Sequence, residues 1–193
     1  MKVTLREIMG PWDAGWVLDK HSVSSTPVGT WPNGRTRFET IRTDVGEATY
    51  QLKYNYDFTK VDLLAQTLVD EIFPRLKDVG FIVPMPATNA RARQPVTEVA
   101  LAVGARVGLH VATELLLKAP GGQSLKNLSS KEEKVAAIGD SFSIVDRLNE
   151  GGPWNVLVVD DLFDSGASME AACKVLRGYR KVGKIYVAAL TWT

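Results

Sequence analysis

The sequence predicts an α/β fold: a mainly parallel sheet flanked by helices, with a small β-containing element at the N-terminus. From Gly80 onward, short apolar runs alternate with segments whose apolar residues recur at helical spacing. The runs at residues 81–84 and 156–159 are apolar at nearly every position, which is typical of strands covered on both faces. Strands that alternate with helices in this way favour a parallel sheet.

The N-terminal part has a different pattern. Residues 16–42 contain short segments rich in Val, Thr, Trp and Phe, interrupted by Pro27 and Gly29. The pair Asn33-Gly34 is the sequence signal of a type I′ hairpin turn between two strands. We therefore expect a small β element here.

Two helices are expected to follow. Thr43 or Asp44 would cap the first, which runs through Tyr54, and residues 57–59 would cap the second, which Pro74 ends. The second helix carries an apolar stripe at helical spacing: Val61, Leu64, Ala65, Leu68 and Ile72.

The remaining elements follow in order along the chain. Pro95 suits the first turn of a helix, and the expected buried face of that helix consists of Val96, Val99, Ala100, Val103 and Val107. Next come a Gly- and Lys-rich stretch at residues 118–134, a strand at 141–146, the apolar strand at 156–159, a helix at 167–179 and a last strand at 184–191.

Composition narrows the class of protein. A chain of 193 residues with 45% hydrophobic and 23% charged residues has the size and make-up of one ordinary globular domain. The single cysteine, Cys173, excludes an internal disulfide and a Cys-based zinc ribbon. There is neither an apolar leader nor an apolar run of membrane-spanning length, so a cytoplasmic protein with no membrane partner is expected. A net charge of +1 gives no support to nucleic-acid binding.

The segment at residues 156–168, VLVVDDLFDSGAS, is the most informative part of the sequence. It predicts a buried strand, then Asp160 and Asp161 at its carboxyl end, where ligands bind in open α/β sheets. Residues 164–168 would open a helix, whose first N–H groups and dipole suit a phosphate-sized anion. A phosphate site beside two acids indicates a ligand with hydroxyl groups, a divalent cation, or both. A response-regulator receiver domain also carries paired acids, but it needs about 100 further residues, and only 32 follow Asp161.

These residues resemble the phosphoribosyl-pyrophosphate (PRPP) motif of type I phosphoribosyltransferases. The segments FIVPMPATNARAR, QPVTEVALAVGARVGLHV and GQSLKNLSSKEEKVAAIGDSF are similar, in order and spacing, to ComF-type competence proteins of that family. QLKYNYDFTKVDLLAQTLVDEI resembles a segment upstream in the same proteins. The resemblance covers roughly residues 48–193 and implies the type I phosphoribosyltransferase fold. The expected division is a hood with two helices at residues 1–78 and a core at 79–193.

The chain departs from the ComF pattern in places. It has no cysteine before Cys173, so the N-terminal β element would replace the zinc element of those proteins. Lys134 and Ala137 stand where an arginine and an asparagine are usual, and residues 93–96 replace an RGFN-like run.

The resemblance implies a role for each site residue. Asp160 and Asp161 would hold the ribose hydroxyls of PRPP and its Mg²⁺, and Asp164 would also serve as the general acid/base. The 5-phosphate site would consist of Asp164, Ser165, Gly166, Ala167 and Ser168. The pyrophosphate loop would contain Ala87, Thr88, Arg91 and Arg93, and the mobile loop would bring Lys126, Lys131 or Lys134 to the leaving group.

The expected function is transfer of phosphoribose from PRPP to an unidentified nitrogenous small-molecule acceptor, with Mg²⁺ and release of pyrophosphate. Two alternatives stay open: a non-catalytic regulator that binds PRPP or a nucleotide, and a ComF-like accessory factor in DNA uptake. A homodimer is also left open.

Some residues favour a structural interpretation. Cys173 recurs with Met169, Ala172 and Leu176 at helical spacing and is expected in the core. His110 stands among apolar residues and is expected to be a structural histidine, whereas His21 is left open. The N-terminal aromatics are expected mostly in packing, and one of them, or Trp192, would stack on the acceptor: Trp12, Trp16, Trp31, Tyr50, Tyr54 and Tyr56.

Overall fold

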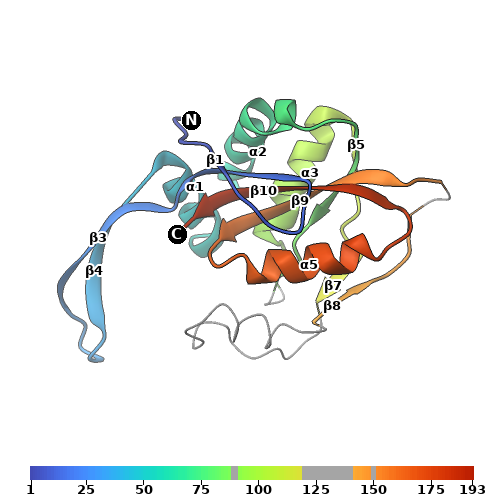
Figure 1. Cartoon of the computed structure of the whole chain (residues 1–193). Helices are drawn as coiled ribbons and strands as arrows, with labels where there is room; N and C mark the ends of the chain where they lie inside the picture. The colour runs from blue at the N-terminus through green and yellow to red at the C-terminus, as the bar shows by residue number, and fades with distance from the viewer. Residues whose placement is uncertain (88–90, 119–140, 149–150) are drawn as a thin grey trace.

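A computed structural model of the chain describes residues 1–87, 91–118, 141–148 and 151–193 (Figure 1). Its centre is a six-stranded sheet in the order β1-β2-β10-β9-β5-β6. All neighbouring pairs are parallel except β1 with β2. The predicted α/β class with a mainly parallel sheet is confirmed. The sheet strands are β1 (Arg6–Glu7), β2 (Ala14–Lys20), β5 (Val79–Pro84), β6 (His110–Val111), β9 (Trp154–Phe163) and β10 (Val182–Trp192).

Helices cover both faces of this sheet (Figure 1). On one face lie α1 (Asp44–Tyr54), α2 (Lys60–Glu71), the 3₁₀ turn η1 (Phe73–Arg75) and α3 (Pro95–Val107). On the other lie α5 (Ala167–Arg177) and a small antiparallel pair, β7 (Leu116–Lys118) with β8 (Phe142–Ile144). The expected strand at residues 141–146 exists, but it pairs with β7 and not with the central sheet.

The two-sided cover explains why β9 is apolar at consecutive positions. Val156 and Val158 lie in the core cluster under α5, whereas Leu157 and Val159 lie in the cluster under α1, α2 and α3. All four side chains are almost fully buried. Because successive side chains of a strand point to opposite faces, only a strand covered on both sides needs no polar alternation.

The helix predictions hold at most positions. Thr43 is the N-cap of α1, and its Oγ1 accepts a hydrogen bond of 2.9 Å from the Gly46 amide. The predicted apolar stripe of α2 is buried, and α2 ends at Glu71 before the 3₁₀ turn that contains Pro74. Pro95 is the first residue of α3.

The N-terminal β element divides into two parts. β2 pairs in parallel with β10 and belongs to the central sheet, whereas β3 (Ser22–Thr30) and β4 (Thr36–Arg42) form a separate antiparallel hairpin. Figure 1 shows this hairpin projecting away from the sheet. The hairpin is confirmed, but its type I′ turn was wrong, since that turn needs positive φ at both central residues and only Gly34 has it, at φ 80°. A longer loop joins the strands, closed by a 2.8 Å bond from the Trp31 amide to the Arg35 carbonyl.

Two structural predictions concern single residues. Cys173 is fully buried, and this burial raises the pKa of its thiol to about 12, so the expected core role is confirmed. His110 is exposed on the edge strand β6, so the expectation of a packed structural histidine was wrong. An edge strand as short as β6 leaves the His110 side chain uncovered.

Candidate functional site

The carboxyl ends of the parallel strands meet at one edge of the sheet, and β9 extends furthest there beside β5. The last residue pair between β5 and β9 is Pro84 with Val159, whereas β9 stays paired with β10 as far as Phe163. Asp160 and Asp161 therefore lie within the strand and not after it, just beyond the end of β5. This is the edge where ligands bind in open α/β sheets.

The strand alternation separates the two carboxylates. Asp161 points to the face that α1 covers, where its Oδ2 lies 2.7 Å from Nζ of Lys53. Asp160 comes next to it along the pleat and accepts a 2.8 Å hydrogen bond from the Asp161 amide. The neighbouring acids thus have different surroundings.

The pKa of Asp160 is raised to about 7, first by burial and then by the negative charge of Asp161, although the Asp161 amide, Lys53 and Lys118 act to lower it. Burial likewise lowers the pKa of Lys118, whose interaction with Asp160 opposes that shift. An acid held this far from its usual range stores an unfavourable charge that a cation or a hydroxyl donor would relieve.

The turn after β9 has a backbone geometry that requires glycine. Gly166 has φ 80°, and a Cβ there would lie 2.9 Å from the ring of Phe163. Only glycine fits these two demands, and they set the start of α5 at Ala167. Ser165 and Ser168 lie on either side of Gly166 and Ala167. Because α5 begins soon after the carboxyl end of β9, its first N–H groups and its positive dipole end lie at the same edge as the acids.

Asp164 is exposed at the beginning of this turn. Its Oδ1 accepts a 3.0 Å hydrogen bond from Oγ1 of Thr193, the residue that follows β10. The bond fixes the carboxylate relative to β10.

Lys53 is the functional residue that sequence analysis missed. It lies in the last turn of α1, reaches Asp161 with its ammonium, and accepts a 2.8 Å hydrogen bond from Arg91 Nη1 with its backbone carbonyl. Burial alone would lower the pKa of Lys53, but the charge and hydrogen bond of Asp161 outweigh it, and the pKa of Lys53 is raised. The sequence signal for Lys53 is its position in the QLKY segment, which begins one of the stretches that resemble ComF-type proteins.

The two arginines predicted for a pyrophosphate loop are held by neighbouring elements. Arg91 also lies 5.4 Å from the ring centroid of Tyr56. Arg93 forms a 2.6 Å ion pair with Glu98 and lies 3.9 Å from the ring centroid of Phe58. Ala87 is exposed, and Thr88 lies outside the described residues. Of this loop, Arg91 is linked to the acid pair, through Lys53.

The lysines predicted for the mobile loop, Lys126, Lys131 and Lys134, all lie outside the described residues. So do Ala137 and most of the Gly- and Lys-rich stretch.

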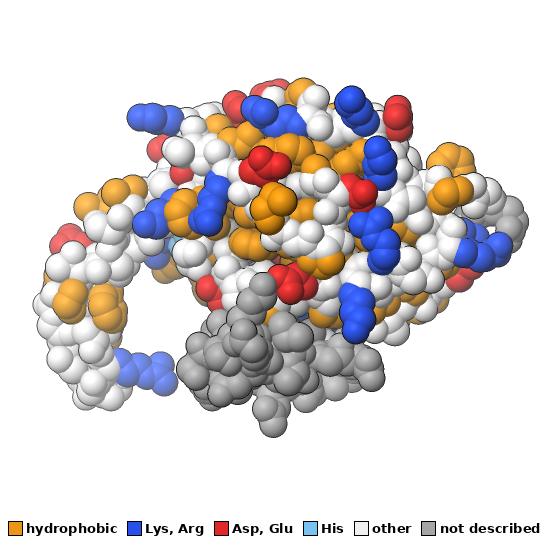
Figure 2. Space-filling view, in the orientation of Figure 1, with side chains coloured by type: hydrophobic (Ala, Val, Ile, Leu, Met, Phe, Trp, Pro, Cys, Tyr) orange, Lys and Arg blue, Asp and Glu red, His pale blue; other side chains and the backbone are white. Residues whose placement is uncertain are grey.

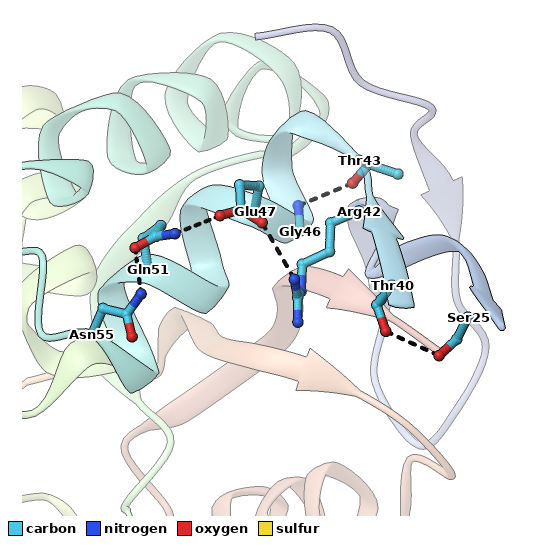
Figure 3. A network of polar contacts seen from close by, with 8 residues as sticks. All are labelled: Ser25, Thr40, Arg42, Thr43, Gly46, Glu47, Gln51 and Asn55. Carbon is cyan, nitrogen blue, oxygen red and sulfur yellow. Dashed lines mark hydrogen bonds and ion pairs between the residues drawn. The ribbon is translucent and has the colours of Figure 1, made fainter. Parts of the chain in front are cut away.

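Helix α1 connects the hairpin to this site (Figure 3). Arg42, the last residue of β4, pairs with Glu47. Further along the helix, Gln51 donates a hydrogen bond to Glu47, and Asn55 donates one to Gln51. At the other end, Gly46 lies so close to the backbone of His21 that a Cβ would be 1.9 Å from its carbonyl oxygen. Since α1 is fixed at its start, the position of its last turn is fixed too.

His21 follows β2 on the same edge. Its Nδ1 lies 3.1 Å from Oγ1 of Thr191, and that hydroxyl donates a 3.0 Å hydrogen bond to the carbonyl of Asp161. Burial lowers the pKa of His21, and the charges of Arg42 and Lys53 lower it further. His21, which the sequence left open, is thus connected to the acid pair through the Thr191 hydroxyl.

The aromatic residues proposed for stacking differ in exposure. Trp12 is buried, whereas Trp31, Tyr54 and Tyr56 are exposed and lie outside the core. Their rings contact neighbouring side chains at the surface: Arg37, Tyr50 and Arg91. Trp192 has Arg6 at 4.4 Å and Lys20 at 5.5 Å from its ring centroid. These cations already contact the Trp192 ring, which makes it a poor surface for a base.

The acid pair is the candidate position for a metal ion. Among the residues that the structure describes, no group of three or more His, Cys, Asp or Glu side chains is placed to hold an ion. Two carboxylates nevertheless fit Mg²⁺, since this ion is commonly held by one or two carboxylates together with substrate phosphates and water. No helix in the described ranges is long and apolar enough to span a bilayer.

Comparison with solved structures places the fold. The chain is similar over its whole length to 76% of adenine phosphoribosyltransferase from Trypanosoma brucei, solved with AMP, pyrophosphate and ribose-5-phosphate, with a TM-score of 0.51 and 11% identity. The architecture, a mostly parallel sheet flanked by helices, is that of the type I phosphoribosyltransferases.

Two further solved structures are similar with lower TM-scores. Xanthine-guanine-hypoxanthine phosphoribosyltransferase from Helicobacter pylori matches with a TM-score of 0.44 and 17% identity, over 72% of this chain and 77% of that one. Adenine phosphoribosyltransferase from Saccharomyces cerevisiae matches with a TM-score of 0.41 and 16% identity, over 87% and 85%. No family model and no curated protein matches the sequence.

Proposed function

We propose that this protein is a phosphoribosyltransferase that binds PRPP with Mg²⁺ and transfers its phosphoribose to a nitrogenous small molecule. The observation that carries the proposal is the continuous segment from Asp160 to Ser168. It combines two acids, one with a pKa raised to about 7 by burial, with a glycine-dependent turn at the N-terminus of α5. Acids for a ribose diol and amides for its 5-phosphate are what a phosphoribosyl group requires.

In the proposed reaction, the bond between C1 of ribose and the pyrophosphate oxygen breaks, and a bond from the acceptor nitrogen to C1 forms. Asp160 and Asp161 would hold the ribose hydroxyls and the Mg²⁺, which supplies charge neutralisation for the departing pyrophosphate. Asp164 would accept the proton that leaves the acceptor nitrogen. Its hydrogen bond from Thr193 orients the carboxylate for this step.

Positioning would account for most of the rate enhancement. The α5 amides and the acid pair are attached to one strand, so they would hold the two ends of the ribose phosphate at a fixed separation. Arg91 would shift from the Lys53 carbonyl toward the pyrophosphate, and Arg93 would contribute the donors that Glu98 does not use.

The ComF-type assignment is part of the same proposal. Its support is the QLKY segment, which forms the end of α1 and brings Lys53 to Asp161. Neither a DNA-uptake role nor a purely regulatory role has a structural observation in its favour, and a homodimer remains a proposal.

The test is calorimetric titration of the protein with PRPP in the presence of Mg²⁺. We expect saturable binding that falls at least about 100-fold in Asp160→Asn/Asp161→Asn. The matched control is Asp62→Asn/Asp70→Asn, which removes two exposed acids from α2 and should bind as wild type does. Absence of PRPP binding by the folded wild type would refute the proposal.

Turnover is tested separately, by pyrophosphate release with nucleobases and amines as acceptors. Release that depends on the acceptor supports transfer. Binding without release from any acceptor would instead identify a PRPP-binding regulator.

A further inference from the structure

Lys53 has a position that the proposed reaction does not by itself explain. It is the ion-pair partner of Asp161 among the described residues, at 2.7 Å, and the side chains of Lys53 and Asp161 are only 29% and 14% exposed. An ammonium this close to a shielded carboxylate occupies space that a metal ion or a ribose hydroxyl would need.

The helix holds Lys53 in place from several directions. Gly46 contacts the His21 backbone at the start of α1, and Thr43 Oγ1 donates a 2.6 Å hydrogen bond to the Lys20 carbonyl. At the end of α1, the Lys53 carbonyl accepts the hydrogen bond from Arg91. Tertiary contacts at both ends of α1 therefore fix the backbone of Lys53 and keep its side chain within reach of Asp161.

The ion pair offsets the negative charge of the two adjacent acids. Lys53 and Lys118 both offset the charge of Asp160, and Lys53 has the larger effect. Without Lys53, the adjacent Asp160 and Asp161 would lose the cation that is ion-paired with Asp161. A partly buried carboxylate without a counter-ion attracts any available cation, because Coulomb interactions are much stronger where water is excluded.

We propose that Lys53 is the resident counter-ion of Asp161, and that a divalent cation reaches Asp161 only by displacing the Lys53 ammonium. The free protein would then bind metal ions poorly, and the cation would enter together with a ligand that compensates for the lost ion pair. The identity of that ligand as PRPP rests on the proposed function, but the competition between Lys53 and the cation does not.

Displacement from Asp161 would also leave the Lys53 ammonium free to pair with an anionic group of the ligand. Because Arg91 donates a hydrogen bond to the Lys53 carbonyl, this ammonium would lie on the side where the resemblance places the pyrophosphate. Lys53 is thus a positioning residue: it neutralises Asp161 in the free protein and gives way when the ligand and its cation arrive together.

The experiment uses Mn²⁺ alone as the probe, followed by electron paramagnetic resonance on the PRPP-free protein at pH 8. We expect weak binding by wild type and about tenfold or tighter binding by Lys53→Met. The gain should disappear in Lys53→Met/Asp161→Asn. The matched control is Lys60→Met, which removes an exposed lysine paired with Asp57 at 3.4 Å and should leave Mn²⁺ binding unchanged.

Two further variants guard against a folding defect in Lys53→Met. Lys53→Gln should show the same gain, whereas Lys53→Arg keeps the positive charge and should bind Mn²⁺ as weakly as wild type does. Unchanged Mn²⁺ affinity in folded Lys53→Met or Lys53→Gln, or a gain that survives Asp161→Asn, would overturn the inference. Because PRPP is absent, a protein that fails to bind PRPP can still pass this test, and the reverse also holds.

Discussion

The segment from β9 to α5 and the β3–β4 hairpin lie at opposite extremes of this molecule. In the first, the four consecutive side chains at residues 156–159 are buried on both faces of the sheet. Asp160, Asp161 and the turn at Gly166 follow directly. In the second, large apolar side chains are exposed, with Val23 at 63%, Phe38 at 56% and Ile41 at 60%. Figure 2 shows hydrophobic side chains exposed at the surface of the projecting hairpin.

This contrast indicates which part of a site the core fixes. A rigid strand and its following turn can hold a ribose phosphate, because their geometry is set by packing on both sides. A two-stranded hairpin without a third strand has little stability of its own, and its exposed positions tolerate substitution. We therefore expect the hairpin to bear on acceptor choice and the β9–α5 segment on PRPP.

The largest expected stability effect comes from a contact at the base of the hairpin, where α1 meets the residue that follows β2. Gly46→Ala should cost about 3 kcal/mol in free energy of unfolding, because the new Cβ would meet the His21 carbonyl at 1.9 Å and force α1 away from β2. Urea denaturation measures this. Gly108→Ala, at φ 70° and with nothing within 4 Å of its Cβ, measures the separate cost of backbone strain. Gly46 has no positive φ, so a Gly46→Ala variant that loses no stability would show that α1 is not clamped there.

The second prediction uses the pH dependence of Asp160. Its pKa is raised to about 7 by burial and Asp161, so between about pH 4 and pH 7 the folded protein binds a proton that the unfolded chain does not. Stability should therefore fall as pH rises through this window. In EDTA, Asp160→Asn should remove this decline and be on the order of 2 kcal/mol more stable than wild type at pH 8. Parallel stability curves for the two proteins would contradict the raised pKa.

The third prediction compares glycines with the same backbone angle in the two regions. Gly166 and Gly34 both have φ 80°, but a Cβ at Gly166 meets Phe163, whereas a Cβ at Gly34 has nothing within 4 Å. Each alanine variant should lose about 1 kcal/mol from the backbone, and Gly166→Ala should lose more. Only Gly166→Ala should also weaken PRPP binding, which calorimetry would measure. Weakened binding in Gly34→Ala would place the hairpin in the phosphate site.

The smallest effect is expected in the hairpin itself. Phe38→Ser should change the free energy of unfolding by less than about 0.5 kcal/mol, because the side chain is already 56% exposed. PRPP affinity should stay at the wild-type value, while the ranking of acceptors in the pyrophosphate-release assay should change. An unchanged ranking would remove the hairpin from acceptor selection.

Elements with local signals could be predicted from the amino-acid sequence. Apolar runs predicted β5 and β9, helical spacing predicted α2 and α3, and the Asp-Asp and Asp-Ser-Gly-Ala-Ser patterns marked one edge of the sheet. Each depends on the period of side chains along a single element or on a short turn, so neighbouring residues suffice to reveal it.

The contributions of distant segments emerge only in the folded chain. Folding places β2 in the central sheet, beside a strand about 170 residues later, and it joins Lys53 to Asp161 across more than 100 residues. It also turns the adjacent acids to opposite faces, so that Asp161 acquires a counter-ion while burial raises the pKa of Asp160. These outcomes depend on which helix covers which face of the sheet, and no local pattern in the sequence records that choice.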